Sequence, residues 1–139
     1  MIRLLALLAL LPGLALAQPR PFNCVGAEQL EDDVFAIPFG RNATTPGEAA
    51  RSPLAAAAEA AKRQPDRNLC VLGHAGQAEG GATTSTRLAA QRAGQVAQAL
   101  AALGVERDRI RAEARVAGFS RQRVIPAERS VTVVLLPVP

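Results

Sequence analysis

The sequence predicts an α/β (α+β) two-layer sandwich with the element order β-α-β-α-β-β. Residues 69–73 (LCVLG) form a short, nearly continuous apolar run, which is typical of a central strand covered on both faces. Residues 110–116 (IRAEARV) alternate small or apolar residues with charged ones, as a half-buried strand does. Two alanine-rich stretches with helical spacing separate the strand candidates, so we expect helices packed over one face of a sheet.

The N-terminus has the pattern of a cleaved signal peptide. Arg3 precedes an apolar run at 4–11, and a small-residue cleavage site follows at 15–17 (ALA). The run is short for a membrane span and is broken by Pro12-Gly13. We divide the chain into a signal peptide (1–17), an extended N-terminal segment (18–33) and one domain (34–139). We expect a periplasmic protein with no transmembrane segment after cleavage, associated with the outer membrane or the cell wall.

The first half of the domain predicts a strand and a helix. Residues 34–39 (VFAIPF) form a strand candidate, and its Pro38 favours an edge position. Two residues can cap the following helix, Thr45 and Ser52, because a proline follows each of them. Pro53 cannot continue a regular helix, so we expect a kink or a restart there. An alanine-rich helix then runs over 54–62 and ends at residues 64–66.

The second half of the domain predicts a strand, a helix and two further strands. After the strand at 69–73, a helix begins at Thr84 or Ser85, either of which can cap it, and ends near Leu103 before Gly104. Strands follow at 110–116 and 131–136. In the first of these the buried face is formed by Ile110, Ala112, Ala114 and Val116.

Charge says little about the partner of this chain. Without Arg3 there are 15 basic residues against 12 acidic ones, a net charge of +3, and several arginines lie between 107 and 129. This balance is compatible with an anionic cell-wall polymer or membrane surface, but charge alone favours an ordinary solvated surface. Nucleic acid is disfavoured because the chain has no Trp or Tyr and only 4 Phe to stack on bases.

Cys24 and Cys70 are the only two cysteines. In an exported chain they can form a disulfide, which would stabilise the fold by roughly 4 kcal/mol in the loop-entropy description. The alternative is one buried thiol and one free thiol.

Residues that could carry catalysis or bind a metal are few. His74 is the only histidine, and no nucleophile signature surrounds it. Cys70 and His74 supply too few ligands for a structural zinc site. The glycine-containing loop after residue 73 has neither the phosphate-loop nor the dinucleotide-binding spacing. We therefore expect no enzyme activity, no metal and no cofactor.

Arg92 is the unusual residue of the second predicted helix. Leu88, Val96, Leu100 and Leu103 form one apolar stripe, and Arg92 lies within it. A guanidinium on the packed side of a helix requires a fixed anionic partner, which is either a ligand or an internal carboxylate. Spacing alone slightly favours the internal salt bridge. The loop that leads into the helix also offers free backbone N–H groups, which can hold a carboxylate.

Around these residues the chain resembles the OmpA-like domain, the peptidoglycan-associating module of Gram-negative cell envelopes. The resemblance rests on Gly73-His74-Ala75-Gly76, where the family has Gly-His-Thr-Asp, and on Ser85-x-x-Leu88-Ala89-x-x-Arg92-Ala93 on the helix. It continues through Gly104-Val105, Arg109-Ile110 and Arg129-Ser130-Val131, and covers roughly residues 34–136. It implies the same β-α-β-α-β-β fold.

The resemblance also implies a ligand site for the diaminopimelate of the wall peptide. The helix arginine, here Arg92, would bind a ligand carboxylate in forked geometry. The motif aspartate is replaced by Gly76, the helix asparagine by Ser85 and the second arginine of the last strand by Ser130, whereas Glu79 offers a substitute acid. Loss of one charge-assisted contact costs roughly 1.5–3 kcal/mol, or ten- to a hundredfold in affinity. The implied site residues are His74, Gly76, Ser85, Arg92 and Arg129.

Two functions follow from this resemblance. The first is non-catalytic, non-covalent association with peptidoglycan through the loop and the N-terminal part of the second helix, weakened by Gly76. The alternative is a degenerate OmpA-like fold that serves as a structural or protein-interaction module, with an envelope protein as partner and without peptidoglycan binding.

Overall fold

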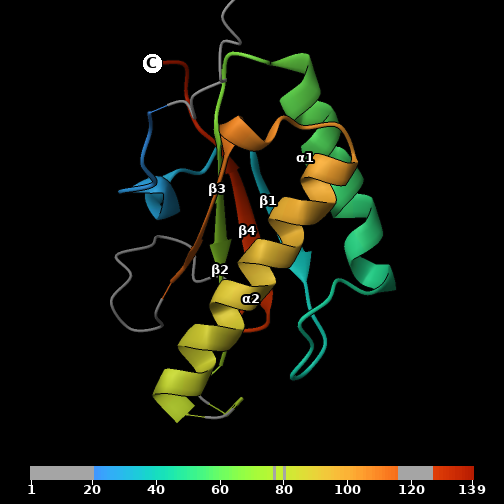
Figure 1. Ribbon diagram of the computed structural model, residues 1–139, viewed down its shortest axis with the longest axis vertical. Coiled ribbons are helices and arrows are strands. Elements are labelled where there is room, and N and C mark those ends of the chain that lie inside the picture. The colour runs from blue at the N-terminus through green and yellow to red at the C-terminus, as the bar shows by residue number, and fades with distance from the viewer. Residues whose placement is uncertain (1–20, 77, 80, 116–126) are drawn as a thin grey trace, which may run out of the picture.

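The computed structural model describes residues 21–76, 78–79, 81–115 and 127–139. Four strands form one sheet, β1 (Val34–Pro38), β2 (Leu69–Gly73), β3 (Ile110–Ala114) and β4 (Ser130–Leu135). Helices α1 (Arg51–Arg63) and α2 (Gly81–Ala102) lie over the same face of this sheet (Figure 1). The predicted signal peptide at 1–17 lies outside the described residues.

The sheet has the order β1-β4-β2-β3. Strand β4 pairs antiparallel with both β1 and β2, and β2 pairs parallel with β3. The predicted element order and the two-layer architecture are confirmed, and so is the edge position of Pro38 at the end of β1. Strand β2 is central and buried along its whole length, as the apolar run predicted.

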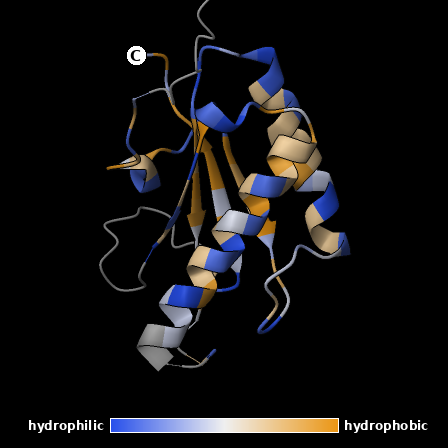
Figure 2. Ribbon diagram, in the orientation of Figure 1, coloured by the Kyte–Doolittle hydropathy of each residue, from blue (hydrophilic) through white to orange (hydrophobic). Residues whose placement is uncertain are grey.

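Alternate residues of the central strands face two separate cores. Toward the helices, Leu69 and Val71 pack with the alanines of α1 and with Val96 and Leu100 of α2. On the far face, Cys70 and Leu72 pack against the N-terminal segment. Figure 2 shows the central strands as largely hydrophobic, beneath helices in which hydrophobic and hydrophilic residues alternate.

Both helices begin differently from the prediction. A 3-10 turn, η2 (Glu48–Ala50), leads directly into α1, whose N-cap residue is Ala50 with no side-chain hydrogen bond. The caps expected at Thr45 and Ser52 are therefore wrong, and so is the kink or restart expected at Pro53, because α1 is continuous through this residue. Pro53 is accommodated because it is in the first turn, where a helix has no internal use for its N–H groups. Helix α2 begins at Gly81, so Thr84 and Ser85 lie inside it and neither is its cap.

The apolar pattern was misleading at Leu103 and in β3. Leu103 is 43% exposed because α2 ends at Ala102, and Gly104 (φ 104°) turns the chain away. Ala112, expected on the buried face of β3, is exposed, and Ile110 is only half-buried. Strand β3 is an edge strand, so the helix layer covers it incompletely. Val116, which completed the predicted face, lies outside the described residues.

Gly73 sets how closely α2 approaches the sheet. A Cβ atom added at Gly73 would lie 1.9 Å from the carbonyl oxygen of Ala89 and 3.0 Å from Cβ of Ala93. The backbone of α2 therefore packs directly on the end of β2, which brings the following loop and the middle of α2 together. Within the described ranges, no helix has the length and apolar character needed to cross a membrane.

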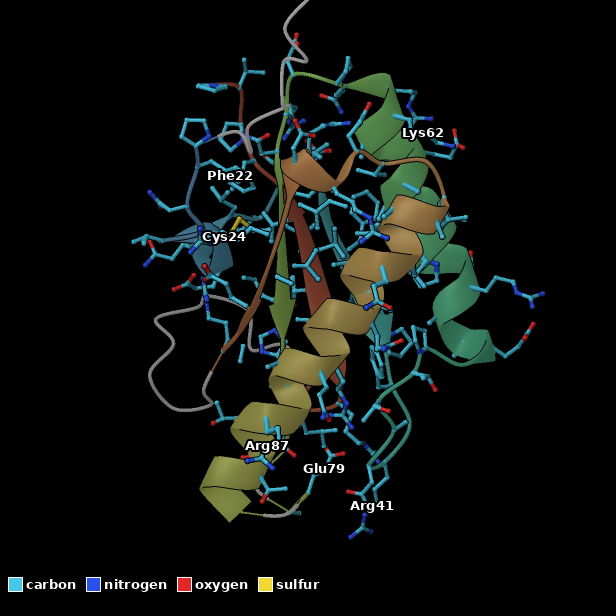
Figure 3. The ribbon with its side chains drawn as sticks, viewed as in Figure 1. Phe22, Cys24, Arg41, Lys62, Glu79 and Arg87 are labelled. Atoms are coloured by element: carbon cyan, nitrogen blue, oxygen red, sulfur yellow. A yellow bond between two sulfur atoms is a disulfide. The ribbon has the colours of Figure 1, made fainter. Side chains whose placement is uncertain are left out.

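The disulfide between Cys24 and Cys70 is present. It joins the N-terminal segment to the far face of β2, where Phe22 and Ala27 also pack. The short helix η1 (Ala27–Gln29) belongs to this segment, which lies on the side of the sheet opposite α1 (Figure 3). A covalently fastened segment thus covers the second face of the sheet at Cys70 and Leu72 of β2 and Val134 of β4.

Replacing Gly73 by alanine should lower the free energy of unfolding by roughly 3 kcal/mol or more, because the new methyl group collides with helix backbone. The matched control is Gly94→Ala in α2, where an added Cβ meets nothing within 4 Å. This control should raise stability by roughly 0.5–1 kcal/mol through helix propensity. Urea unfolding of both variants measures the two effects. Equal effects of the two substitutions would contradict the close approach.

Replacing both Cys24 and Cys70 by alanine should cost about 4 kcal/mol of stability, because the bond closes a loop in the unfolded chain. The sequence separation of 46 residues sets this magnitude. Denaturant unfolding of the oxidised protein and of the double variant measures the difference. Reduction should also expose the N-terminal segment to limited proteolysis while β2 stays protected. Identical cleavage rates with and without reductant would show that the bond does not fasten this segment.

Candidate functional site

The residues singled out by the resemblance gather at one end of the sheet. Strands β1 and β2 end here and β4 begins here. The N–H of His74 donates to the carbonyl of Ser130 (2.9 Å), and the N–H of Phe39 donates to the carbonyl of Arg129 (2.9 Å). The loop after β1, the loop after β2 and the N-terminal half of α2 therefore meet at this end.

Arg92 projects from α2 into this junction and is fully buried. Its Nε donates to the carbonyl of Ala43 (2.8 Å), and Nη1 and Nη2 donate to the carbonyls of His74 (3.1 Å) and Gly40 (3.2 Å). The remaining two N–H groups point at one carboxylate. Nη1 lies 3.0 Å from Oε1 of Glu79 and Nη2 lies 2.5 Å from its Oε2. All five donors of the guanidinium are thus used.

The carboxylate of Glu79 is equally well satisfied. Its Oε1 also accepts the N–H of Gly76 (3.1 Å), and its Oε2 accepts the N–H of Asn42 (2.7 Å). The hydrogen bonds from the guanidinium of Arg92, together with those two N–H groups, lower the pKa of Glu79 from 4.5 to about 2 despite its burial. Arg92 and Glu79 form a buried, forked ion pair, which confirms the internal salt bridge that spacing slightly favoured.

This ion pair connects segments that are far apart in the sequence. Glu79 lies in the turn before α2, and Asn42 lies in the loop after β1. The ring of Phe39 also lies against the guanidinium, with 5.5 Å between the ring centroid and Cζ of Arg92. Figure 3 shows Glu79 at the end of the molecule where the exposed side chains of Arg41 and Arg87 lie. Two exposed arginines therefore lie at the same end of the molecule as the ion pair.

His74 contributes to this junction only through its backbone. Its imidazole lies on the opposite face of the sheet, where Nε2 is 3.0 Å from Oγ1 of Thr132. Burial and the nearby guanidinium of Arg115 lower the pKa of His74 from 6.5 to about 4, so the ring is neutral at pH 7. The sheet therefore separates the imidazole of His74 from the side chain of Arg92.

The other implied site residues take different positions. Gly76 is buried, and a Cβ built on it would lie 2.7 Å from Oε2 of Glu128, whose own side chain comes from the segment before β4. Ser85 is buried in α2, and Arg129 is exposed beside β4. Their role toward a ligand stays a prediction. Among the described residues, no group of three His, Cys, Asp or Glu is placed to hold a metal ion.

Sequence reasoning missed two features. The first is the loop after β1, whose backbone groups at Gly40, Asn42 and Ala43 complete the surroundings of Arg92 and Glu79. Backbone partners leave no residue-type signal. The second is Arg109, which is fully buried and donates to the carbonyls of Ala61, Gln64 and Arg67 at the end of α1. Arg109 lies in a stretch of charged residues that predicts a solvated surface.

The two lowered pKa values predict an acid-sensitive fold. In the unfolded chain His74 becomes protonated below pH 6.5, whereas in the folded protein it becomes protonated only near pH 4. The free energy of unfolding should therefore fall between pH 6.5 and 4, by about 3 kcal/mol for a shift of this size. Glu79 should cause a further loss between pH 4.5 and about 2, because its carboxyl must be protonated against Arg92.

Denaturant unfolding across this pH range measures both losses. The variant His74→Gln keeps a polar group near Thr132 but cannot titrate, so it should lose the slope between pH 6.5 and 4 and retain the one below pH 4.5. An unchanged slope above pH 4.5 in this variant would contradict the assignment to His74.

Comparison with known proteins places this geometry in a family. The model of the OmpA family matches residues 39–130, about two thirds of the chain and all of the junction. No curated protein matches this chain. Among solved structures, the peptidoglycan-associated lipoprotein of Burkholderia pseudomallei has a TM-score of 0.61 at 20% identity, over 73% of this chain and 90% of that one.

Two further structures show the same fold. The OmpA-like domain of FopA1 from Francisella tularensis has a TM-score of 0.61 at 18% identity, over 80% of this chain and 79% of that one. A putative MotB-like protein from Desulfovibrio vulgaris has a TM-score of 0.57 at 17% identity, over 76% of each chain. At these identities the structures bear on the fold, and the family match covers the loop after β2, helix α2 and strands β2 and β3. The chain belongs to the OmpA family.

Proposed function

We propose that this chain is a non-catalytic domain of the cell envelope that associates non-covalently with peptidoglycan at the junction of β1, β2 and α2. In this proposal residues 1–17 are a signal peptide, residues 18–33 precede the domain, and the mature protein works in the periplasm. The likeness to a peptidoglycan-associated lipoprotein supports the ligand class.

One observation of the structure carries the proposal. A fully buried guanidinium, Arg92, holds a carboxylate in forked geometry at the end of the sheet, beside a loop and the N-terminal half of a helix. The stem peptides of peptidoglycan end in carboxylates, and a guanidinium is the side chain best suited to bind them in pairs of hydrogen bonds. The exposed Arg41, Arg87 and Arg129 add positive charge around or near this end.

A second candidate function has its own observation. Because every donor of Arg92 is already used within the protein, the arginine can be purely structural. The domain would then serve as a structural or protein-interaction module without peptidoglycan binding. Removing one partner of such a buried pair costs about 3–5 kcal/mol, so Arg92→Ala alone would not separate lost binding from lost folding.

The test is co-sedimentation of the mature protein with purified sacculi. The wild type should sediment with them, free diaminopimelate should compete, and Arg92→Lys should weaken retention by about ten- to a hundredfold because the forked pairing is lost. Arg109→Lys is the matched control. Arg109 is equally buried, but its guanidinium donates to backbone carbonyls at the C-terminal end of α1, outside the proposed site. Thermal unfolding of both variants checks that they are folded at the assay temperature.

Retention that neither diaminopimelate nor Arg92→Lys reduces would contradict this site. An absence of co-sedimentation would favour the second candidate function.

A further inference from the structure

The structure assigns to Glu79 the part of an internal ligand. We propose that Arg92, with the N–H groups of Asn42 and Gly76, forms a carboxylate-binding site that Glu79 occupies, so that an external carboxylate binds only in exchange for it. The identification of that carboxylate with a peptidoglycan stem peptide rests on the function proposed above.

The site consists of four donors that converge on one carboxylate. Two come from Arg92, and one each comes from the backbone N–H of Asn42 and of Gly76, at 2.5–3.1 Å. None of these four belongs to Glu79 or to its chain neighbours. A free carboxylate of the same shape would therefore find the same four partners if the side chain of Glu79 were absent.

The two guanidinium donors are held in place without Glu79. Three carbonyls, those of Gly40, Ala43 and His74, accept hydrogen bonds from the guanidinium and fix its plane. The ring of Phe39 lies against it. Removing the carboxylate should thus leave a preorganised anion site, since little reorganisation is required before a new anion binds.

Exchange, rather than addition, follows from the count of donors. The guanidinium has five N–H groups, and all are used. A second carboxylate beside Glu79 would find no free donor on Arg92 and would be repelled by the charge of Glu79, whose lowered pKa keeps it ionised at neutral pH. Glu79 therefore competes with any ligand of Arg92 and lowers its apparent affinity.

The first experiment supplies the missing carboxylate as acetate. The variant Glu79→Ala should unfold at a lower temperature than the wild type, and acetate should raise its melting temperature in a saturable way. Sodium chloride at equal ionic strength should not. Glu113→Ala is the matched control, because Glu113 also accepts hydrogen bonds from two arginines, Arg111 and Arg115. Acetate should leave the wild type and this control unchanged.

The second experiment measures the exchange with a peptidoglycan component. Glu79→Ala should bind free diaminopimelate and sacculi at least about tenfold more tightly than the wild type, because its internal competitor is gone. In the wild type, saturating diaminopimelate should shift the NMR signals of the Asn42 and Gly76 amides. This measurement needs no variant, so it stands even if Glu79→Ala folds poorly.

The outcomes separate the two proposals. A folded Glu79→Ala protein that acetate does not stabilise, or wild-type binding that leaves both amides unshifted, overturns the exchange at Glu79. If Glu79→Ala does not fold, recovery of the fold in acetate supports the site, and failure to recover together with unshifted wild-type amides overturns it. Acetate stabilisation without any binding of sacculi or diaminopimelate overturns the peptidoglycan function alone.

Discussion

The buried ion pair of Arg92 and Glu79 is the interaction on which the functional end of this domain depends. A guanidinium inside a helix–sheet interface loses its hydration, and only a complete set of acceptors offsets that cost. Three carbonyls and one carboxylate provide this set. They come from the loop after β1, the end of β2 and the turn before α2. The requirement of one side chain thus determines how three separate segments are arranged, and Gly73 permits it by letting α2 lie directly on the sheet.

At this end of the molecule the sheet separates two sets of side chains. The side chain of Arg92 belongs to the helix layer, whereas the imidazole of His74 lies on the far face with Thr132 and Arg115. That far face is not open to solvent along β2, because the disulfide of Cys24 and Cys70 holds the N-terminal segment over it. A histidine and an arginine that belong to the same family motif therefore lie in different environments. One is neutral and buried, and the other is charged and paired.

The guanidinium of Arg92 serves both the fold and the proposed carboxylate binding of this domain. An arginine that holds an internal carboxylate is already arranged to hold an external one, because both require forked donors in the same plane. The presence of Glu79 decides which of the two partners it has. Among OmpA-like domains the resemblance leads us to expect an acid at the position of Gly76. Here the carboxylates of the junction come instead from Glu79, which is buried, and from Glu128, which lies against Gly76.

The sequence by itself determined the element order, the central position of β2, the edge position of Pro38 and the anomaly of Arg92. These features follow from local periodicity, from backbone chemistry and from one charged residue in an apolar stripe. It also limited the disulfide to one pairing. Helix starts and the exposure of Leu103 and Ala112 were predicted wrongly, because alternative caps and coverage by neighbouring layers are not local properties. Only the tertiary structure decided which carboxylate pairs with Arg92 and on which face His74 lies. Backbone carbonyls and N–H groups from a distant loop complete that pairing, and such partners are identical for almost every residue type.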